Sequence, residues 1–387
     1  DSDGRPPPRP ASDPAARAKL MFTSGTTGEQ KGVVWSRRAE VLHGDAYAHE
    51  LLPVAEGEGL YTCLPLSHVT AQGTLLAGLW RGARVAIDDR FRPFEFWSRV
   101  RAGRAVAFTF VGTILSTLAK LPEGRGDLDN PVAWALGAAT PTSLWPAIED
   151  RFGLAVVETW GQTETASGWT FPAHLPQPPG TVGRPSARVE VLVAGPDGAA
   201  PPAGELGELW LRPREPHVLL EGYLRPGVEL SSAFDAEGWY HTGDLMALED
   251  TGDLRFAGRL RDAIRRRGEM IAPAEIEEAA LGHPDIVEAA AVGVPAVGDV
   301  EEEVLVAVVS RAGTSLEPAH VHRFLAGVLP SFMVPRYVRV VDALPKTATT
   351  RVQKHLIRSQ GSEGSWDARP GWGRHGPRRA VGPAPGG

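Results

Sequence analysis

The sequence predicts an α/β fold: a doubly wound parallel sheet, followed by a β-rich subdomain and a small α+β domain at the carboxyl terminus. Between residues 61 and 160, short apolar runs alternate with longer amphipathic runs. This alternation is typical of parallel strands joined by helices that cover both faces of a sheet. After Thr181 the apolar runs are separated by Gly/Pro turns, which favours a smaller β subdomain. Beyond Gly268 a compact segment carries helical and strand-like runs.

In the first part, the predicted strands cover residues 61–64, 84–87, 106–111, 132–136 and 154–158. The predicted helices cover residues 69–80, 93–101, 114–121 and 143–152. Ligands of such sheets bind at the carboxyl ends of the strands. We therefore expect the chemical motifs in the loops that follow these strands.

The later elements are predicted from the same kind of pattern. The β subdomain has predicted strands at residues 189–193 and 208–211, and a hairpin at 245–248 and 254–256 around E-D-T-G-D. The small domain has predicted helices at 274–281 and 318–329 and strands at 286–292 and 304–309. We predict a flexible lead (1–17), a core (18–258), a charged link (259–268), a small domain (269–358) and a disordered tail (359–387).

Composition excludes several classes of protein. The 387 residues are 42% hydrophobic and 22% charged, which is ordinary for a globular protein that makes two or more domains. A net charge of −7 with mixed signs argues against nucleic acid as the main partner. A single cysteine, Cys63, excludes a disulfide framework. No apolar run reaches membrane-spanning length and the Pro-rich start is no signal peptide, so we expect a cytoplasmic protein.

The central motif is L-M-F-T-S-G-T-T-G-E-Q-K-G-V-V, residues 20–34. Glycine allows a tight turn whose amides point outward, and outward amides, hydroxyls and an ammonium together can bind a polyphosphate. The candidate phosphate-binding residues are Thr23, Ser24, Gly25, Thr26, Thr27, Gly28 and Lys31. A Gly/Ser/Thr surface turn is the alternative for such a stretch. It is not the usual P-loop, because Gln30 precedes the lysine.

Further motifs follow predicted strands. L-P-L-S-H ends at His68, which could equally cap or pack a helix. L-G-A-A-T (136–140) has small residues that let a planar ring approach the backbone, although plain helix–sheet packing also explains it. E-T-W-G-Q-T-E (158–164) offers an indole that can stack on a base and a carboxylate, Glu164, that suits a hard cation. W-Y-H-T-G-D (239–244) ends in Asp244, which alone would be a turn residue.

Together these motifs resemble the adenylate-forming superfamily, which includes acyl-CoA synthetases, luciferases and peptide-synthetase adenylation domains. T-S-G-T-T-G-x-x-K-G resembles its phosphate loop, with Gln30 where proline is usual. The run 158–164 resembles Y-G-x-T-E, with Trp160 for tyrosine, and 239–244 resembles Y-x-T-G-D. The resemblance covers about residues 13–358. Family members carry a large region before the phosphate loop, so the chain looks like a fragment or one half of a split protein.

The resemblance implies a role for each matching residue. Glu164 would hold Mg²⁺, Arg261 would be the hinge about which a mobile small domain turns, Gly268 would line the pantetheine tunnel for CoA, and His68 would lie at the acyl side of the site. The remaining implied contacts are to ATP: adenine, ribose and α-phosphate groups would be bound by Gly137, Ala138, Ala139, Trp160, Gly161, Thr163, Asp244 and Arg259.

The last motif, L-P-K-T-A-T-T-R-V-Q-K (344–354), departs from the family pattern P-K-T-x-[ST]-G-K-[IV]-x-[KR]. Thr350 replaces the glycine, and Arg351 replaces the lysine that is expected to bridge the carboxylate and the α-phosphate. Arginine keeps the charge but not the compact ammonium. Lys346 and Lys354 are candidate substitutes, so the catalytic cation is Arg351 or one of these.

The resemblance implies an ATP-dependent acyl-CoA ligase that uses Mg²⁺ and CoA and acts on a small carboxylic acid. Residues 259–278 look most like carnitine/crotonobetaine-type ligases. One alternative is a domain that loads a carrier protein, although no carrier-like L-G-x-[HD]-S segment follows. Another is a nucleotide-binding remnant without turnover. The sequence leaves open which acid is used and whether the chain forms a homo-oligomer.

Overall fold

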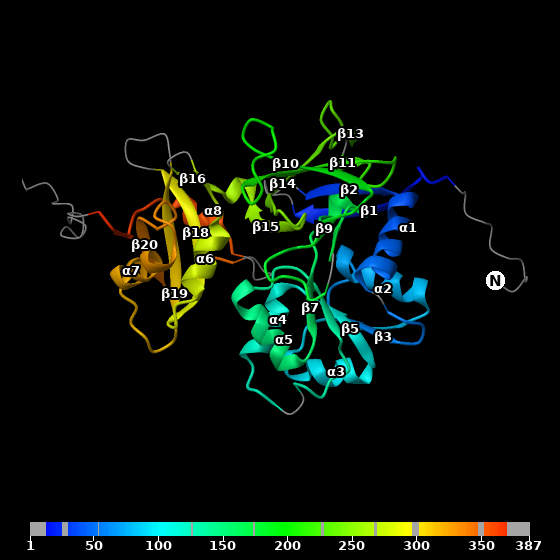
Figure 1. The fold of residues 1–387 in the computed structure, drawn as a ribbon, viewed down its shortest axis with the longest axis horizontal. Helices are drawn as coiled ribbons and strands as arrows, with labels where there is room; N and C mark the ends of the chain where they lie inside the picture. Colours follow the sequence, from blue (N-terminus) through cyan, green and yellow to red (C-terminus); the bar gives the residue numbers. More distant parts are fainter. Residues whose placement is uncertain are drawn as a thin grey trace, which may run out of the picture. The chain divides into compact units, whose positions relative to one another are not determined.

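The computed structural model describes residues 13–24, 30–52, 54–124, 127–172, 175–225, 228–266, 269–295, 302–346 and 352–369. The chain divides into two compact units, Asp1–Phe256 and Ala257–Gly387, and each is described here by itself (Figure 1). The α/β class and the parallel sheet predicted from the sequence are confirmed.

A parallel sheet with strand order β4-β3-β5-β6-β7 forms the lower part of the first unit in Figure 1. Every neighbouring pair in it is parallel. Its strands are β3 (Gly59–Thr62), β4 (Arg84–Ile87), β5 (Ala105–Thr109), β6 (Trp134–Gly137) and β7 (Ala155–Glu158). They lie within a few residues of the five predicted strands. All of them therefore present their carboxyl ends at one edge of the sheet.

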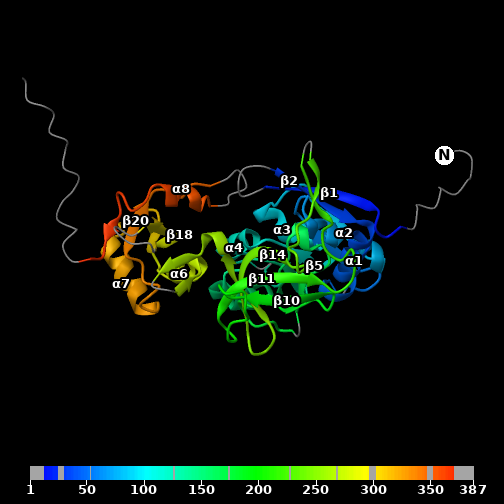
Figure 2. The same cartoon turned by 90° about the horizontal axis from the view of Figure 1, so that it is seen from above.

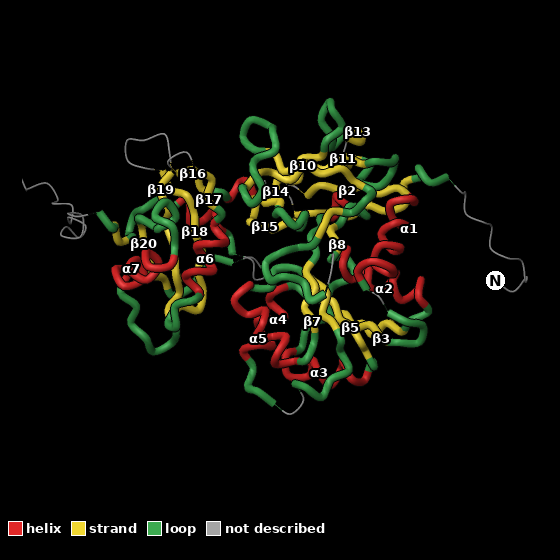
Figure 3. The backbone as a smooth tube through the Cα atoms, in the orientation of Figure 1, coloured by secondary structure: helices red, strands yellow, loops and turns green. Residues whose placement is uncertain are grey.

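Both faces of this sheet are buried, because successive strand residues join different apolar clusters. Leu60 and Leu136 belong to one cluster, whereas their neighbours Tyr61 and Ala135 belong to the other. Helices α4 and α5 lie on one side of the strands and α2 on the other (Figure 3). The helices of this part are α2 (Val69–Arg81), α3 (Phe96–Ala102), α4 (Gly112–Lys120) and α5 (Trp145–Phe152). A short 3₁₀ turn at Pro93–Glu95 precedes α3, and another at Thr142–Leu144 precedes α5.

Antiparallel strands complete the first unit. One sheet has the order β1-β2-β12-β13 and another the order β10-β11-β14-β15. Their strands are β1 (Arg17–Ser24), β2 (Gln30–Ser36), β12 (Gly222–Arg225), β13 (Val228–Ser231), β10 (Val189–Ala194), β11 (Leu206–Pro213), β14 (Tyr240–Leu248) and β15 (Leu254–Arg259). A short pair, β8 (Thr170–Phe171) and β9 (Arg184–Pro185), also forms. The predicted β-rich part is thus present, and β1 begins inside the predicted flexible lead, at Arg17.

Helix α1 (Arg37–Ala46) and the π-helical turn Tyr47–Leu51 were not predicted from the sequence. The Ser36 side chain accepts a hydrogen bond from the Ala39 amide and so begins the helix. The buried face of α1 carries Ala39, His43 and Ala46, so it lacks the large apolar residues by which an amphipathic helix is recognised.

The second unit has a sheet of order β18-β19-β20-β21, a hairpin and three helices within its described residues. The strands are β16 (Ile264–Arg266), β17 (Glu269–Ile271), β18 (Ile286–Pro295), β19 (Glu302–Ser310), β20 (Tyr337–Val341) and β21 (Trp366–Asp367). The helices are α6 (Pro273–Leu281), α7 (Pro318–Val328) and α8 (Lys354–Ser359). In Figure 2, α6 and α7 lie on one side of this sheet and α8 on the other.

The disordered tail predicted from residue 359 onward is wrong for its first part. Residues up to Arg369 are described, and β21 pairs with β20. Asp367 in β21 forms an ion pair with the buried Arg336, at 3.1 Å. A tertiary ion pair therefore orders a stretch whose composition indicates disorder. Within the described part of the chain, no helix is long and apolar enough to cross a membrane.

Gly112, the first residue of α4, touches the loop after β6. A Cβ at this position would lie 1.7 Å from the carbonyl oxygen of Ala139, so Gly112→Ala must displace that loop. We expect the free energy of unfolding to fall by about 1–3 kcal/mol, the usual range for overpacking. Denaturant unfolding measures this effect. Gly124→Ala is the control, because a Cβ there meets nothing within 4 Å. Equal stability of the two variants would contradict the close contact.

Candidate active site

Three of the predicted motifs follow strands that end at the same edge of the parallel sheet. L-P-L-S-H follows β3, L-G-A-A-T begins in β6, and E-T-W-G-Q-T-E begins at the last residue of β7. The interior of this edge is polar: the Thr109 hydroxyl donates to Thr62 Oγ1 at 2.9 Å, and the Thr74 hydroxyl lies 3.1 Å from Thr109 Oγ1. The three motifs therefore lie at the carboxyl edge of the sheet, where the sequence predicts them.

The phosphate-loop motif lies at the end of the β1–β2 hairpin. These strands are antiparallel, and Thr23 pairs with Lys31 and Ser24 with Gln30. Gly25, Thr26, Thr27 and Gly28 lie outside the described residues. The strand pairing thus places the two ends of the predicted loop side by side, with Lys31 next to its beginning.

Lys31 and Glu164, predicted to bind phosphate and Mg²⁺, are brought together by Tyr223. Lys31 Nζ lies over the Tyr223 ring, 5.2 Å from its centroid, and the Tyr223 hydroxyl donates to Glu164 Oε1 at 3.3 Å. Tyr223 reaches this position because β12 pairs with β2, with Tyr223 opposite Val33. Burial, and then the Glu164 charge, raise the pKa of the Tyr223 phenol, which stays protonated and can donate.

The L-G-A-A-T loop contains a strained residue. Gly137 is buried, whereas Ala138 and Ala139 are exposed, and Ala139 has a φ of 67°. A left-handed backbone is unfavourable for alanine and is held only where the surroundings require it. Here the residue after Ala139 is fixed in position, because the backbone amide of Thr140 donates a hydrogen bond to the Glu158 carboxylate.

Glu158 is a buried carboxylate that joins the ends of β6 and β7. It is 5% exposed, and burial raises its pKa to about 7, although the hydrogen bond from Thr140 opposes this shift. Gln177 fixes its backbone, since the Glu158 amide donates to Gln177 Oε1 and Gln177 Nε2 donates to the Glu158 carbonyl, both at 3.0 Å. Glu158 thus ties two motif loops together.

The predicted adenine and ribose residues also come together. The Trp160 indole donates to Asp244 Oδ2 at 2.9 Å, and Gln162 Nε2 donates to the same oxygen at 2.7 Å. Gly161 lies between them in the chain, and the Thr163 carbonyl accepts from the indole of Trp35 at 2.7 Å. Stacking of Trp160 on adenine stays a prediction.

His68 takes the capping role that the sequence left open. Its Nδ1 accepts the Thr70 amide at 3.3 Å, at the start of α2, and the residue is exposed. A role at the acyl side of the site stays a prediction.

In the second unit, both candidate substitute cations form ion pairs. Lys346 Nζ lies 2.7 Å from Glu288 Oε1, and Lys354 Nζ lies 2.6 Å from Glu277 Oε1. Burial raises the pKa of Glu277, and Lys354 opposes that shift. Arg351 and Gly268 lie outside the described residues. Lys354 therefore has a structural partner that any catalytic contact must replace.

The two arginines predicted at the domain junction lie in regular structure. Arg259 is the last residue of β15, and Arg261 is exposed in the 3₁₀ turn Leu260–Asp262. Their ribose and hinge roles stay predictions. The basic run that follows is not all surface: Arg266 is 7% exposed and lies 2.8 Å from Glu303.

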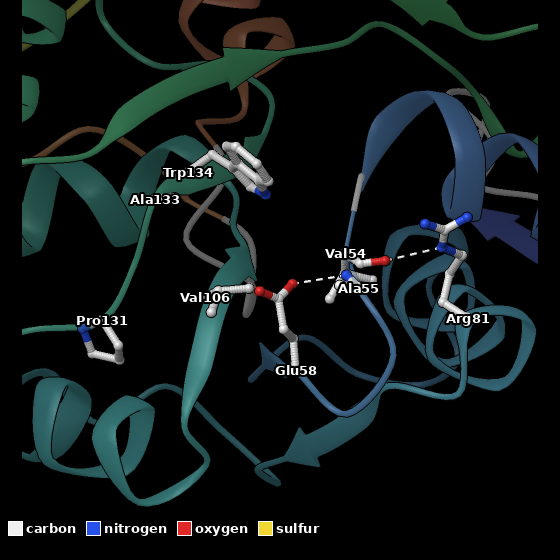
Figure 4. Close-up of a pocket in the computed structure, with 8 residues that line it drawn as sticks. All are labelled: Val54, Ala55, Glu58, Arg81, Val106, Pro131, Ala133 and Trp134. Atoms are coloured by element: carbon white, nitrogen blue, oxygen red, sulfur yellow. Dashed lines mark hydrogen bonds between the residues drawn. The ribbon is translucent and has the colours of Figure 1, made fainter.

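A pocket of about 420 Å³ lies away from these motifs (Figure 4). Its lining residues come from the amino-terminal sides of β3, β5 and β6, and include Glu58, Val106 and Trp134. Arg81 Nε donates to the Val54 carbonyl and the Ala55 amide to Glu58 Oε2, at 2.9 and 2.7 Å. None of the predicted site residues lines it.

Over residues 1–224 the chain matches the family described as AMP-binding enzyme, and over residues 275–351 it matches the AMP-binding enzyme C-terminal domain. The chain belongs to the AMP-binding enzyme family. This assignment agrees with the phosphate-loop, T-E and T-G-D motifs and with the place of each in the structure.

Named relatives of the chain include CoA ligases. It is 34% identical over 352 residues to a sulfoacetate–CoA ligase of Cupriavidus necator, covering 90% of this chain and 68% of that protein. It is 30% identical over 350 residues to an oxalate–CoA ligase of Arabidopsis thaliana, covering 88% and 66%. ATP-bound MatB from Rhodopseudomonas palustris has 26% identity and a TM-score of 0.77, covering 90% and 69%. The chain spans about two thirds of the length of these relatives.

Sequence reasoning missed three residues of the candidate site: Tyr223, Gln162 and Glu158. Gln162 and Glu158 lie inside a motif that was recognised, so their position next to Trp160 was a usable signal. Tyr223 carried none, because its contact depends on the pairing of β12 with β2. Among the described residues, no group of three or more His, Cys, Asp or Glu side chains could hold a metal ion by itself.

Glu158→Gln should change how stability depends on pH. The native state holds this proton up to about pH 7, whereas the ordinary pKa is 4.5, so the parent loses stability as pH rises between these values. Glutamine keeps an acceptor for the Thr140 amide but does not titrate. The variant should therefore gain up to about 3 kcal/mol relative to the parent across this window. Denaturant unfolding at a series of pH values measures it, and parallel profiles for the two proteins would contradict the buried, protonated carboxyl.

Proposed function

We propose that the chain is an ATP-dependent acyl-CoA ligase, which forms an acyl-adenylate from a carboxylic acid and then a CoA thioester. The observation that carries the proposal is the approach of Lys31 and Glu164 across Tyr223, beside the ends of the phosphate-loop hairpin. A lysine and a carboxylate in one place suit a nucleoside triphosphate, because the lysine can bind the phosphates and the carboxylate can bind their counterion. The CoA ligases among its relatives support the choice of reaction.

In the first half-reaction, an oxygen of the acid attacks the α-phosphorus of ATP, and the bond to pyrophosphate breaks. Lys31 would bind phosphate oxygens, and the hydroxyls and amides of residues 23–28 would hold the rest of the chain of phosphates. In the second half-reaction, the CoA thiol attacks the acyl carbon and AMP leaves. The protein contributes position and charge neutralisation rather than covalent chemistry.

Glu164 fits a magnesium ion. One carboxylate is what such an ion commonly takes from a protein when phosphate oxygens and water complete its shell, and the ion would neutralise phosphate charge. The Tyr223 hydroxyl holds one oxygen of Glu164 and limits how the carboxylate turns.

Substrate choice is a separate proposal. Residues 259–278 look most like carnitine/crotonobetaine-type ligases but do not indicate the acid, whereas the named relatives include a sulfoacetate–CoA ligase, an oxalate–CoA ligase and a feruloyl-CoA synthase. A second candidate function, nucleotide binding without turnover, is favoured by one observation: Lys346 and Lys354 are each paired with a glutamate.

ATP–pyrophosphate exchange against a panel of carboxylic acids tests the proposal. Exchange with at least one acid is expected. Lys31→Ala should weaken ATP binding. Glu164→Gln should slow exchange and raise the Mg²⁺ requirement. Lys120→Ala, an exposed lysine at the end of α4, is the control. ATP binding with no exchange for any acid would favour the second candidate, and unchanged Lys31 and Glu164 variants would contradict the site.

A second comparison identifies the catalytic cation. If Arg351 acts, Arg351→Ala should lower exchange by about 10²-fold, the usual loss of a charge-stabilising donor. Arg351→Lys with Thr350→Gly should raise it, because the ammonium is compact and glycine frees the loop. Lys354→Ala must be combined with Glu277→Gln, since the single variant leaves a buried carboxylate without its partner. Loss of exchange in that double variant, with Arg351→Ala unaffected, would assign the role to Lys354.

A further inference from the structure

A buried polar cluster connects the T-E motif with the T-G-D motif. Gln162 Nε2 donates to Asp244 Oδ2 at 2.7 Å and to the Thr242 carbonyl at 2.9 Å, and Gln162 Oε1 accepts the Tyr240 hydroxyl at 2.8 Å. The Trp160 indole adds its donor to Asp244 Oδ2. Trp160, Gln162, Tyr240, Thr242 and Asp244 are all at most 9% exposed. Three partners on one amide fix the orientation of the Gln162 side chain.

The geometry at Asp244 is specific. Two donors from residues 160 and 162 converge on the same carboxylate oxygen, which fixes the rotation of the carboxylate about the Cβ–Cγ bond of Asp244. The backbone is fixed as well: the Asp244 amide donates to Thr242 Oγ1 at 3.1 Å, and that hydroxyl donates to the Leu209 carbonyl at 2.7 Å. A buried carboxylate needs such donors, and hydrogen bonds to a charged group are the strong ones.

We propose that Gln162 and the indole N–H of Trp160 are positioning groups that orient Asp244 toward the ribose hydroxyls of the nucleotide. The proposal rests on the proposed ATP-dependent function and adds a role that the motif resemblance does not give to either residue. An indole N–H can only donate a hydrogen bond, so at this position it can bind the Asp244 carboxylate but cannot accept a hydrogen bond from another donor. Trp160 in the place of tyrosine thus links the base side of the site to the ribose side.

A positioning role predicts a change in ribose selectivity, which a merely structural role would not produce. A hydrogen bond to a charged group contributes about 1.5–3 kcal/mol, so loss of an oriented Asp244 should weaken ATP binding about 10–100-fold. Binding of 2′-deoxyATP, which lacks one of the hydroxyls, should change much less. The ratio of the two dissociation constants should therefore fall toward one in Gln162→Met and, to a smaller extent, in Trp160→Phe.

The test is isothermal titration of the full chain with ATP and with 2′-deoxyATP in the presence of Mg²⁺, alongside thermal melting of every variant. Asp244→Ala establishes whether Asp244 reads the ribose. Gln177→Met is the matched control, because Gln177 is also a buried glutamine, at 3% exposed, but its hydrogen bonds go to Glu158 and Thr181. We expect that control to lower the melting temperature and to keep the ATP/2′-deoxyATP ratio of the parent.

The outcomes separate this inference from the proposed function. A parent chain that binds neither nucleotide overturns both. A ratio that collapses in Asp244→Ala but persists in Gln162→Met and Trp160→Phe overturns the positioning role alone. A ratio that persists in Asp244→Ala also overturns it, while exchange activity would leave the ligase proposal standing. Should Gln162→Met fail to fold, Trp160→Phe, which keeps an aromatic ring, decides the matter by the same ratio.

Discussion

The site depends on one constraint: carboxylates buried within its strands must be supplied with hydrogen-bond donors. Glu158 and Asp244 meet it differently. Glu158 has the Thr140 amide as its donor, and burial raises its pKa to about 7. Asp244 receives donors from two side chains, Trp160 and Gln162, on a single oxygen. The first arrangement ties two loops of the parallel sheet together, whereas the second joins that sheet to the antiparallel strand β14. Removal of either set of donors would leave a buried charge or force a proton onto it.

Much of the fold could be predicted from the sequence because its information is local. The strands of the parallel sheet are apolar runs bounded by polar turns, and β7 was found to within a residue. Helix α1 was missed because its buried face carries Ala39 and His43 rather than large apolar side chains. Strand β21 was missed because its order depends on the ion pair between Arg336 and Asp367, which are far apart in the sequence. No local pattern encodes such a contact.

The site shows the same division. Lys31, Glu164 and Asp244 were predicted because each lies in a motif whose residue types suit a nucleotide. Tyr223, which contacts both Lys31 and Glu164, lies in no motif and reaches them through the pairing of β12 with β2. The pairing of Lys354 with Glu277 was equally unpredictable, since α6 ends at Leu281 and α8 begins only at Lys354, so the two helices are far apart in the sequence. Sequence reasoning thus identified the groups proposed to bind the nucleotide better than the groups that hold them in place.

The pairing of Lys354 also bears on how charge is distributed in the reaction. A lysine whose partner is a buried glutamate is costly to withdraw, because Glu277 would remain in an apolar setting without a counterion. Arg351 has a guanidinium that can bind two oxygens at once, which suits a bridge between a carboxylate and a phosphate. The ion pair therefore supports the proposal that Arg351, and not Lys354, is the cation of adenylation. Lys354 already has a structural contact, because its ion pair with Glu277 connects the start of α8 with α6.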